Sequence, residues 1–452
     1  MSLRFLTALW AGKLTAFIIR LIDKERGTRL PGVVALKLDP AFLSHVQGID
    51  PDKTVLVTGT NGKSTTTNLI AHVLRRAGRT VVCNQEGANL ESGVAATLLK
   101  QTSLSGRLRG EILLLETDER FLPIIHKRLP ARRLLVTNVQ KDQVQRNGEP
   151  DLILRKLAQV IDQDTILYLN NDEPNSGALS VLAGRVLRYG VAPHSRSFDK
   201  KDDFFAVTQP CPFCGAGVSF SAYNIDNIGP FVCPSCGYGS CIQPDYYGEQ
   251  VNFEEQSFQV AGDKYSFAYS TPYFLYCYIA ALALCRSLGV EPELISRAFV
   301  DFTLPGGRLE DIRVGGHTIS YLRMKQENPE TVQSALDVIA ADREPKLVML
   351  GLDELVDFHP HYTNTFYTYD CDFSRLIASN VEHYICFSGS VAYDAALRLL
   401  YAGVPREKLT ILPTNEDRAI VSELANHACQ NVYMITWLKK YLHLADYAKR
   451  NG

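Results

Sequence analysis

The sequence lacks the charge excess that marks nucleic-acid-binding proteins. Its 452 residues contain 47 Lys and Arg against 49 Asp and Glu, a formal net charge of -2, and the sequence pI is about 6.6. A nucleic-acid-binding domain would normally present a basic face. Low-complexity runs and fixed-period repeats are also missing, which argues against disordered and solenoid proteins. With 46% hydrophobic residues, the chain has the composition of a folded protein.

The sequence also lacks a run of about 20 uninterrupted apolar residues, so we predict no transmembrane helix. The most apolar segment, Leu3–Ile22, is interrupted by Arg4, Lys13 and Arg20 and has no small-residue cleavage site. Its charges recur at helical spacing, which predicts an amphipathic helix. We favour packing of this helix on the protein over contact with a membrane surface, and the second alternative stays open. We therefore expect a cytoplasmic protein with at most peripheral membrane contact.

Short apolar runs alternate with helical stretches along most of the chain. Apolar strands separated by helices predict an α/β fold with a parallel sheet covered on both faces. Ligands bind such sheets where the carboxyl ends of the strands meet the loops. The polar residues at these ends are Thr58, Glu116, Asn138, Asn171 and Asp172. These loops are predicted to form one site.

A second α/β unit is predicted after the segment FTLPGGRLEDI, residues 302–312, whose proline and two glycines indicate a linker. The strand-like runs KLVMLGLD, HYICFSG, KLTILPT and VYMITW follow it, separated by helical segments. We therefore predict a first domain over 1–305 and a doubly wound, Rossmann-like domain over 306–452. The second has about 145 residues, a usual domain size.

The segment VTGTNGKST, Val57 to Thr65, has the features of a phosphate-binding loop between a strand and a helix. It is shorter than a Walker loop, which has four residues between its first glycine and the Gly-Lys pair. Backbone N–H groups at the helix start can bind phosphate, Lys63 can neutralise its charge, and Ser64 can offer a hydroxyl to Mg²⁺. The alternative is a glycine turn with Ser64 or Thr65 near the helix N-terminus. On either interpretation we expect Lys63 at the loop and outside the core.

Two C-x-x-C pairs, Cys211 with Cys214 and Cys233 with Cys236, are separated by 18 residues. Four thiolates at this spacing are typical of a tetrahedral structural zinc site, here a ribbon inserted at about 205–245. A disulfide pair or a redox motif is the alternative, but a cytosolic chain rarely holds disulfides. Because four cysteines leave no open coordination position, the predicted role is structural.

The loop GTNGKST resembles the ATP loop of the Mur ligase family, whose members join a carboxylate to an amine through an acyl phosphate. The resemblance implies magnesium ligation by Ser64 and by Glu116, in LLETDER. It also implies nucleotide contacts from the loop and from three further motifs, VTN, NNDEP and GGRLED: Gly59, Thr60, Asn61, Gly62, Lys63, Ser64, Thr65, Asn138, Asp172 and Arg308. ATP, Mg²⁺ and structural zinc are thus the expected cofactors.

The zinc ribbon, EGANLESG, KDQVQRNGE and YDCDF together resemble the MurT-type subunits of lipid II isoglutaminyl synthase. That resemblance covers most of the chain. It implies a Mur-ligase-like central domain and amidation of the α-carboxylate of D-glutamate in the lipid II stem peptide. The ammonia would come from a partner glutaminase of the GatD type.

Three stretches depart from the MurT pattern. Phe274 and Cys277 stand where the family has asparagines that hold the nucleotide, and RMKQENPET replaces K-N-P-A-G. Asn364 stands where the family has an aspartate that orients the partner's catalytic histidine, and Asp370 or Asp372 could replace it. Two alternatives therefore stay open: an amino-acid ligase that needs no glutaminase, and a non-catalytic binding subunit.

Overall fold

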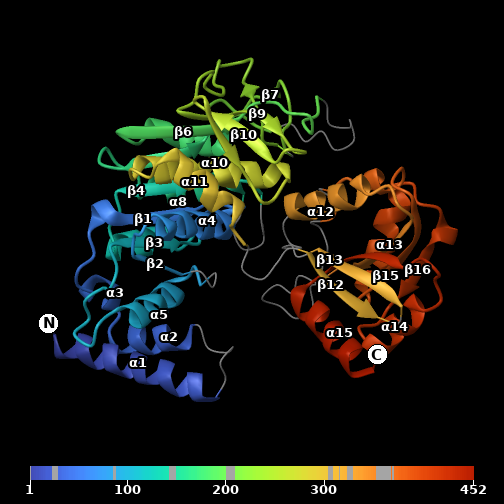
Figure 1. Ribbon diagram of the computed structural model, residues 1–452, viewed down its shortest axis with the longest axis horizontal. Coiled ribbons are helices and arrows are strands. Elements are labelled where there is room, and N and C mark those ends of the chain that lie inside the picture. Colours follow the sequence, from blue (N-terminus) through green and yellow to red (C-terminus); the bar gives the residue numbers. More distant parts are fainter. Residues whose placement is uncertain are drawn as a thin grey trace. The chain divides into compact units, whose positions relative to one another are not determined.

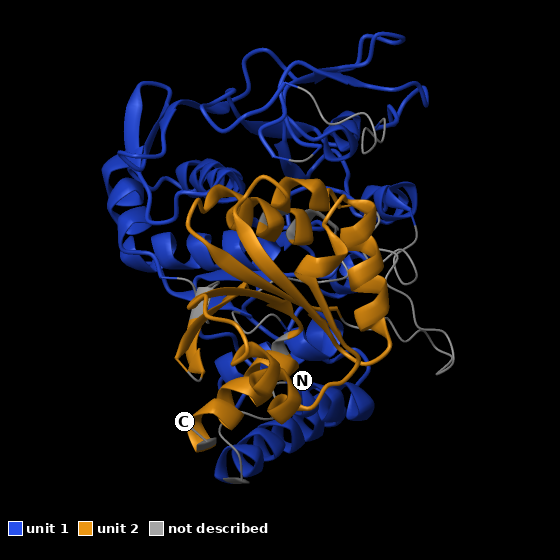
Figure 2. Ribbon diagram, turned by 90° about the vertical axis from the view of Figure 1, so that its right-hand side faces the viewer, with its two compact units in different colours: residues 1–140, 147–201, 207–303 blue, residues 141–146, 202–206, 304–452 orange. Residues whose placement is uncertain are grey.

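In a computed structural model the chain forms two compact units, one of residues 1–140, 147–201 and 207–303 and one mainly of residues 304–452 (Figure 2). Each unit has its own sheet and its own core. The structure describes residues 2–22, 29–84, 88–141, 149–199, 209–225, 227–303, 309–314, 316–322, 329–352, 368 and 371–451.

The sheet of the first unit has nine strands in the order β11-β10-β9-β6-β5-β4-β1-β3-β2. Its seven strands from β2 to β9 are parallel, which confirms the predicted parallel sheet, and β10 and β11 extend it as antiparallel strands. The strands are β1 Thr54–Thr58, β2 Val81–Cys83, β3 Ile112–Glu116, β4 Arg133–Val136, β5 Ile166–Asn170, β6 Arg185–Val191, β9 Tyr246–Asn252, β10 Ser257–Val260 and β11 Asp263–Ser266.

Helices cover both faces of this sheet (Figure 1). One face carries α4 (Lys63–Arg76), α10 (Pro272–Ser287) and α11 (Pro292–Val300). The other carries α5 (Glu91–Gln101), α6 (Leu122–Arg128) and α8 (Pro150–Ala158), whose apolar residues share one core with the strands. Because the sheet is covered on both sides, every residue of β1 and β3 is buried. The short elements are α9 Pro174–Gly177, η1 Pro51–Lys53 and η2 Ala178–Val181.

Three helices precede the sheet: α1 Leu3–Ile22, α2 Leu30–Leu38 and α3 Phe42–His45. The predicted N-terminal helix is confirmed. Its residues Phe5, Ala8 and Leu9 lie on one side and are buried. The prediction that it is amphipathic is wrong, because its opposite side is also apolar and is exposed. None of the helices in the described part of the chain combines the length and apolarity that a membrane span requires.

The second unit holds a six-stranded sheet in the order β12-β13-β17-β14-β15-β16. The hairpin β12–β13 is antiparallel and the other pairs are parallel. Residues of α12 and α13 share the core on one face, and residues of α14 and α15 share the core on the other, as a doubly wound domain requires. The elements are β12 Leu309–Val314, β13 His317–Leu322, α12 Pro329–Ala341, β14 Lys346–Gly351, η4 Phe373–Leu376, β15 Val381–Phe387, α13 Val391–Tyr401, η5 Arg406–Lys408, β16 Leu409–Leu412, α14 Asp417–Leu424, β17 Asn431–Thr436 and α15 Leu438–Asn451.

Candidate nucleotide site and metal centre

The glycine loop lies between the end of β1 and the start of α4. Gly59 and Gly62 have φ of 123° and 83°, values that favour glycine. A Cβ at Gly59 would lie 2.4 Å from Thr137 Oγ1 and 2.7 Å from the Asn138 carbonyl oxygen, so only glycine lets the loop approach the end of β4. Gly62 is itself the N-cap of α4, without a side-chain cap. Ser64 and Thr65 therefore lie inside the first turn, whose N–H groups point out of the helix as an anion site requires.

Asn138 holds this loop in place. Its Oδ1 accepts a hydrogen bond from the Asn61 backbone N–H at 2.9 Å, and its Nδ2 donates to the Asn61 carbonyl at 3.1 Å. The Thr60 N–H donates to the Asn138 carbonyl at 2.9 Å. Because these bonds join residues 77 or more positions apart, the end of β4 sets the shape of the loop.

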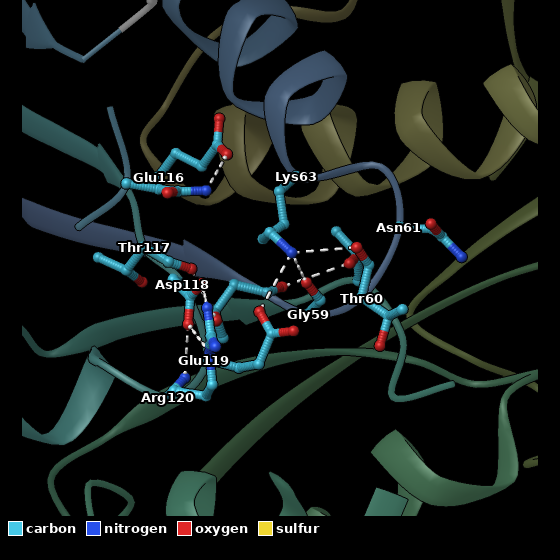
Figure 3. Close-up of polar contacts among 12 residues, drawn as sticks. Gly59, Thr60, Asn61, Lys63, Glu116, Thr117, Asp118, Glu119 and Arg120 are labelled. Atoms are coloured by element: carbon cyan, nitrogen blue, oxygen red, sulfur yellow. Dashed lines mark hydrogen bonds and ion pairs between the residues drawn. The ribbon is translucent and has the colours of Figure 1, made fainter. Parts of the chain in front are cut away.

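Lys63 is buried, with 5% of its surface exposed, so the expectation that it lies outside the core is wrong. Its ammonium group lies 3.1 Å from a carboxylate oxygen of Glu119 and donates to the carbonyls of Thr60, at 3.0 Å, and Gly59. Figure 3 shows Glu119 pointing toward Lys63 from the loop after β3. The sequence analysis missed Glu119, although it follows Glu116 by only three residues in the same strand-end loop.

Glu116 and Ser64 offer the oxygen ligands that Mg²⁺ takes. Glu116 ends β3 directly beside Val57 of β1, and its carboxylate accepts a hydrogen bond from Asn89 Nδ2 at 3.1 Å. Ser64 is exposed in the first turn of α4. Since Mg²⁺ usually keeps waters and phosphate oxygens in its shell, one carboxylate and one hydroxyl are a sufficient protein contribution.

A narrow cavity of about 10 Å³ lies beside the loop. It is lined by residues from several strand ends and from α10: Asn61, Gly62, Thr66, Thr137, Asn138, Asn170, Tyr189, Ile225, Ile228, Tyr273, Tyr276 and Cys277. The Thr66 hydroxyl is buried here without a hydrogen-bond partner among the described residues, as expected of a group that meets a ligand. In its present form the cavity has room for about one water molecule.

The first turns of α10 lie against the loop through Tyr273 and the substituted Cys277. A Cβ at Gly62 would be 3.1 Å from the Tyr273 hydroxyl and 3.4 Å from Cys277 Sγ. Phe274 and Cys277 are both buried. Cys277 therefore places a thiol beside the glycine loop, where an amide group is expected from the family pattern, whereas the Phe274 ring stacks on Tyr269 at 5.0 Å.

Asp172 contacts the cavity indirectly. It is fully buried, and one of its oxygens accepts hydrogen bonds from the Val191 N–H at 2.7 Å and the Tyr276 hydroxyl at 2.9 Å. Tyr276 in turn lines the cavity, so this carboxylate positions a cavity residue of α10. Burial raises the pKa of Asp172 to about 6, against these hydrogen bonds, which lower it.

We expect Asp172→Asn to stabilise the protein above pH 6. The pKa of Asp172 rises from 3.8 in the unfolded chain to about 6 in the folded protein, so its stabilising contribution is complete below pH 3.8 and is lost as the pH rises through 6. The buried charge then costs up to about 3 kcal/mol at pH 7 to 8. The free energy of unfolding, measured in urea between pH 4 and pH 8, should depend less on pH in the variant than in the wild type. Asp164→Asn, at an exposed site, is the control. If the free energy of unfolding changed with pH equally in both variants, this account would be contradicted.

The structure does not test all of the predicted residues of this group. Arg308, Asn364 and Asp370 are outside the described residues. Asp372, the other residue expected to replace the missing aspartate, caps η4 by accepting the Ser374 N–H at 2.9 Å, and its second oxygen lies 3.5 Å from Arg375 Nε. Its carboxylate is thus engaged within its own unit.

The four ribbon cysteines lie together. Their Sγ atoms are all within 4.8 Å of one another, with 3.6 Å between Cys211 and Cys236 and 3.5 Å between Cys214 and Cys233. A tetrahedral zinc with Zn–S bonds of about 2.3 Å needs S–S separations of about 3.8 Å, so the geometry fits a metal. All four are free thiols and not disulfides. In the part of the chain that the structure describes, this is the one such group of His, Cys, Asp and Glu.

The ribbon, with its strands β7 (Ser219–Phe220) and β8 (Phe231–Val232), is anchored to the end of β5. The Tyr238 hydroxyl donates to the Pro174 carbonyl at 2.6 Å, and the Cys241 N–H donates to Asn171 Oδ1 at 2.9 Å. Ile225 and Ile228, between the two strands, line the cavity itself. The ribbon that holds the four cysteines therefore supports one wall of the candidate nucleotide site.

Two protein families match separate parts of this chain: the Mur ligase middle domain at residues 57–209 and the MurT ligase C-terminal domain at residues 326–438. The chain is 28% identical over 407 residues to the MurT subunit of lipid II isoglutaminyl synthase (glutamine-hydrolyzing) from Staphylococcus aureus strain COL, covering 88% of each protein. It is 27% identical over 447 residues to the same subunit from Streptococcus pneumoniae R6, covering 96% of this chain and 95% of that one. The chain is thus similar to MurT subunits over most of its length.

Solved structures show that this MurT-like chain has the Mur ligase fold. A pseudomurein peptide ligase type C from Methanothermus fervidus matches 90% of the chain and 80% of its own length, with a TM-score of 0.64 and 17% identity. MurF from Thermotoga maritima, solved in complex with ADP, matches 93% of the chain and 85% of its own length, with a TM-score of 0.58 and 15% identity. At these identities the likeness shows the fold alone.

Proposed function

We propose that this protein is the ATP-using subunit of a ligase that amidates the α-carboxylate of D-glutamate in the lipid II stem peptide. One observation carries the proposal: a glycine loop that lines a small cavity leads into a buried lysine at a helix N-terminus, and a glutamate ends the strand next to β1, in a chain that resembles MurT subunits along almost its full length. The ADP bound by the Thermotoga MurF supports ATP as the nucleotide.

The first step in this proposal is phosphoryl transfer from ATP to the acceptor carboxylate. Backbone N–H groups at the start of α4 bind the phosphates, and Lys63 neutralises the charge that develops on the transferring group. Glu116 and Ser64 would hold Mg²⁺, which would neutralise part of the phosphate charge when bound. The product is an acyl phosphate, which ammonia then attacks with loss of phosphate. In this view a GatD-type glutaminase supplies the ammonia.

The test uses purified full-length protein with lipid II, ATP and Mg²⁺. One arm adds ammonium chloride, and a second adds glutamine with a GatD-type glutaminase. Mass spectrometry of the stem peptide should show the small mass loss of amidation in both arms. Amidation with ammonia but not with glutamine would reject the glutaminase coupling alone.

Two other outcomes would replace the proposal. Phosphate release that depends on an amino acid, with a mass gain on the peptide, would indicate an amino-acid ligase. Failure to bind ATP in calorimetry would indicate a non-catalytic subunit whose site has lost the asparagines that Phe274 and Cys277 replace. The double variant Phe274→Asn/Cys277→Asn should then bind ATP.

A further inference from the structure

The N-terminal helix α1 has an unusual apolar surface. It forms the outer layer of the first unit, with α2 and α5 between it and the sheet (Figure 1). One side is buried, yet Trp10, Phe17 and Leu21 on the other side are 51%, 60% and 72% exposed. We define the α1 surface by its exposed large apolar residues together with those of α2: Leu3, Trp10, Leu14, Phe17, Ile18, Leu21, Leu30 and Leu38.

The exposed apolar residues of α1 are grouped on one side of the helix and not scattered around it. These residues lie at positions 3, 10, 14, 17, 18 and 21, spacings that place them on one side of the helix, so they form one stripe along 20 residues, about 30 Å long. Contiguous exposed apolar patches on a folded protein mark interaction sites. Trp, Phe and Leu on one face are the composition of helices that lie in the interface of a bilayer.

The segment that carries the α1 surface is predominantly basic. Residues 1–38 contain seven Lys and Arg against two Asp and Glu, a net charge of +5, whereas residues 39–452 contain 40 against 47, a net charge of -7. The described residues 2–22 and 29–38 include no acidic side chain. Arg4, Arg20, Arg29 and Lys37 are exposed beside the apolar stripe. An acidic chain thus has one basic and apolar region, which is complementary to an anionic lipid surface.

We propose that the α1 surface docks this protein on an anionic phospholipid bilayer. The helix lies parallel to the membrane, its apolar stripe enters the boundary between headgroups and acyl chains, and the basic residues contact lipid phosphates. Lys13 takes no part, because its ammonium group donates to the carbonyls of Leu99 and Thr102. The inference depends on this surface alone and not on the proposed reaction.

The first experiment is flotation of the full-length protein with phosphatidylglycerol–phosphatidylethanolamine vesicles and with phosphatidylcholine vesicles. The wild type should float with the anionic vesicles and only weakly with the neutral ones. Phe17→Glu should lower binding at least about tenfold, because a charge replaces an inserted ring. Tyr401→Glu, at an aromatic residue 73% exposed on α13, is the matched control and should bind as the wild type does. Circular dichroism should show both variants folded.

A second measurement locates the contact. The chain has two tryptophans, so Trp437→Phe leaves Trp10 as the only one. Its fluorescence should shift to the blue on adding anionic vesicles and should be quenched by brominated lipid. Three results would overturn the proposal: no flotation at low salt, equal flotation of Phe17→Glu, or an unquenched Trp10. A wild-type dimer in sedimentation velocity that Phe17→Glu dissociates, without vesicle binding, would instead assign the surface to a second copy of the chain.

Discussion

Lys63→Ala is expected to lower ATP turnover by roughly 10³-fold or more, the scale seen when a group that stabilises a transferring phosphoryl group is removed. The buried ammonium group is the cation placed at the glycine loop, and the N–H groups of α4 cannot replace its charge. Phosphate release measured with saturating ATP and Mg²⁺ checks the prediction. A variant that turns over as fast as the wild type would refute the assignment of the loop.

The same substitution should also destabilise the protein, because it leaves Glu119 buried without its partner. Breaking one side of a buried ion pair costs about 3–5 kcal/mol. The double variant Lys63→Ala/Glu119→Gln removes the stranded charge, so its melting temperature should return toward that of the wild type. Its turnover should stay lost. If turnover returned together with stability, Lys63 would have a structural role only.

Purified protein should contain about one zinc per chain, and replacing both Cys211 and Cys214 with serine should remove it. The apolar core of the ribbon comprises Cys211, Val218, Phe231 and Cys233 with a few partly buried neighbours, too little to hold its fold. Structural zinc supplies about 10–16 kcal/mol in zinc-finger peptides, so its loss should unfold the ribbon. Elemental analysis measures the metal, and a melting curve with chelator measures the coupling to stability.

Loss of the metal should also weaken ATP binding, because the ribbon contacts the end of β5 and supplies Ile225 and Ile228 to the cavity. Calorimetry with ATP tests this link. Cys241→Ser is the matched control, since Cys241 is exposed, lies five residues after Cys236 and is outside the metal cluster. Metal-free protein prepared gently, with an unchanged melting temperature, would contradict the zinc assignment.

Local patterns in the sequence were sufficient for much of the fold. The apolar runs predicted the parallel strands of both units except β6, β9 and β13, because a strand buried on both faces needs apolar residues throughout, and that demand is local. The sequence did not predict the antiparallel β10–β11 extension or the β12–β13 hairpin. Their pairing depends on cross-strand contacts and not on any single run.

The candidate site divides in the same way. The sequence alone determined the glycine loop before α4 and the cluster of four cysteines, because glycine conformations, a helix start and two C-x-x-C turns are properties of short segments. Only the tertiary structure showed that Glu119 pairs with Lys63 across 56 positions and that Asp172 holds Tyr276. It also decided which side of α1 is exposed, since periodicity cannot distinguish two apolar faces of one helix. Burial and partners arise from long-range packing, and local sequence does not record them.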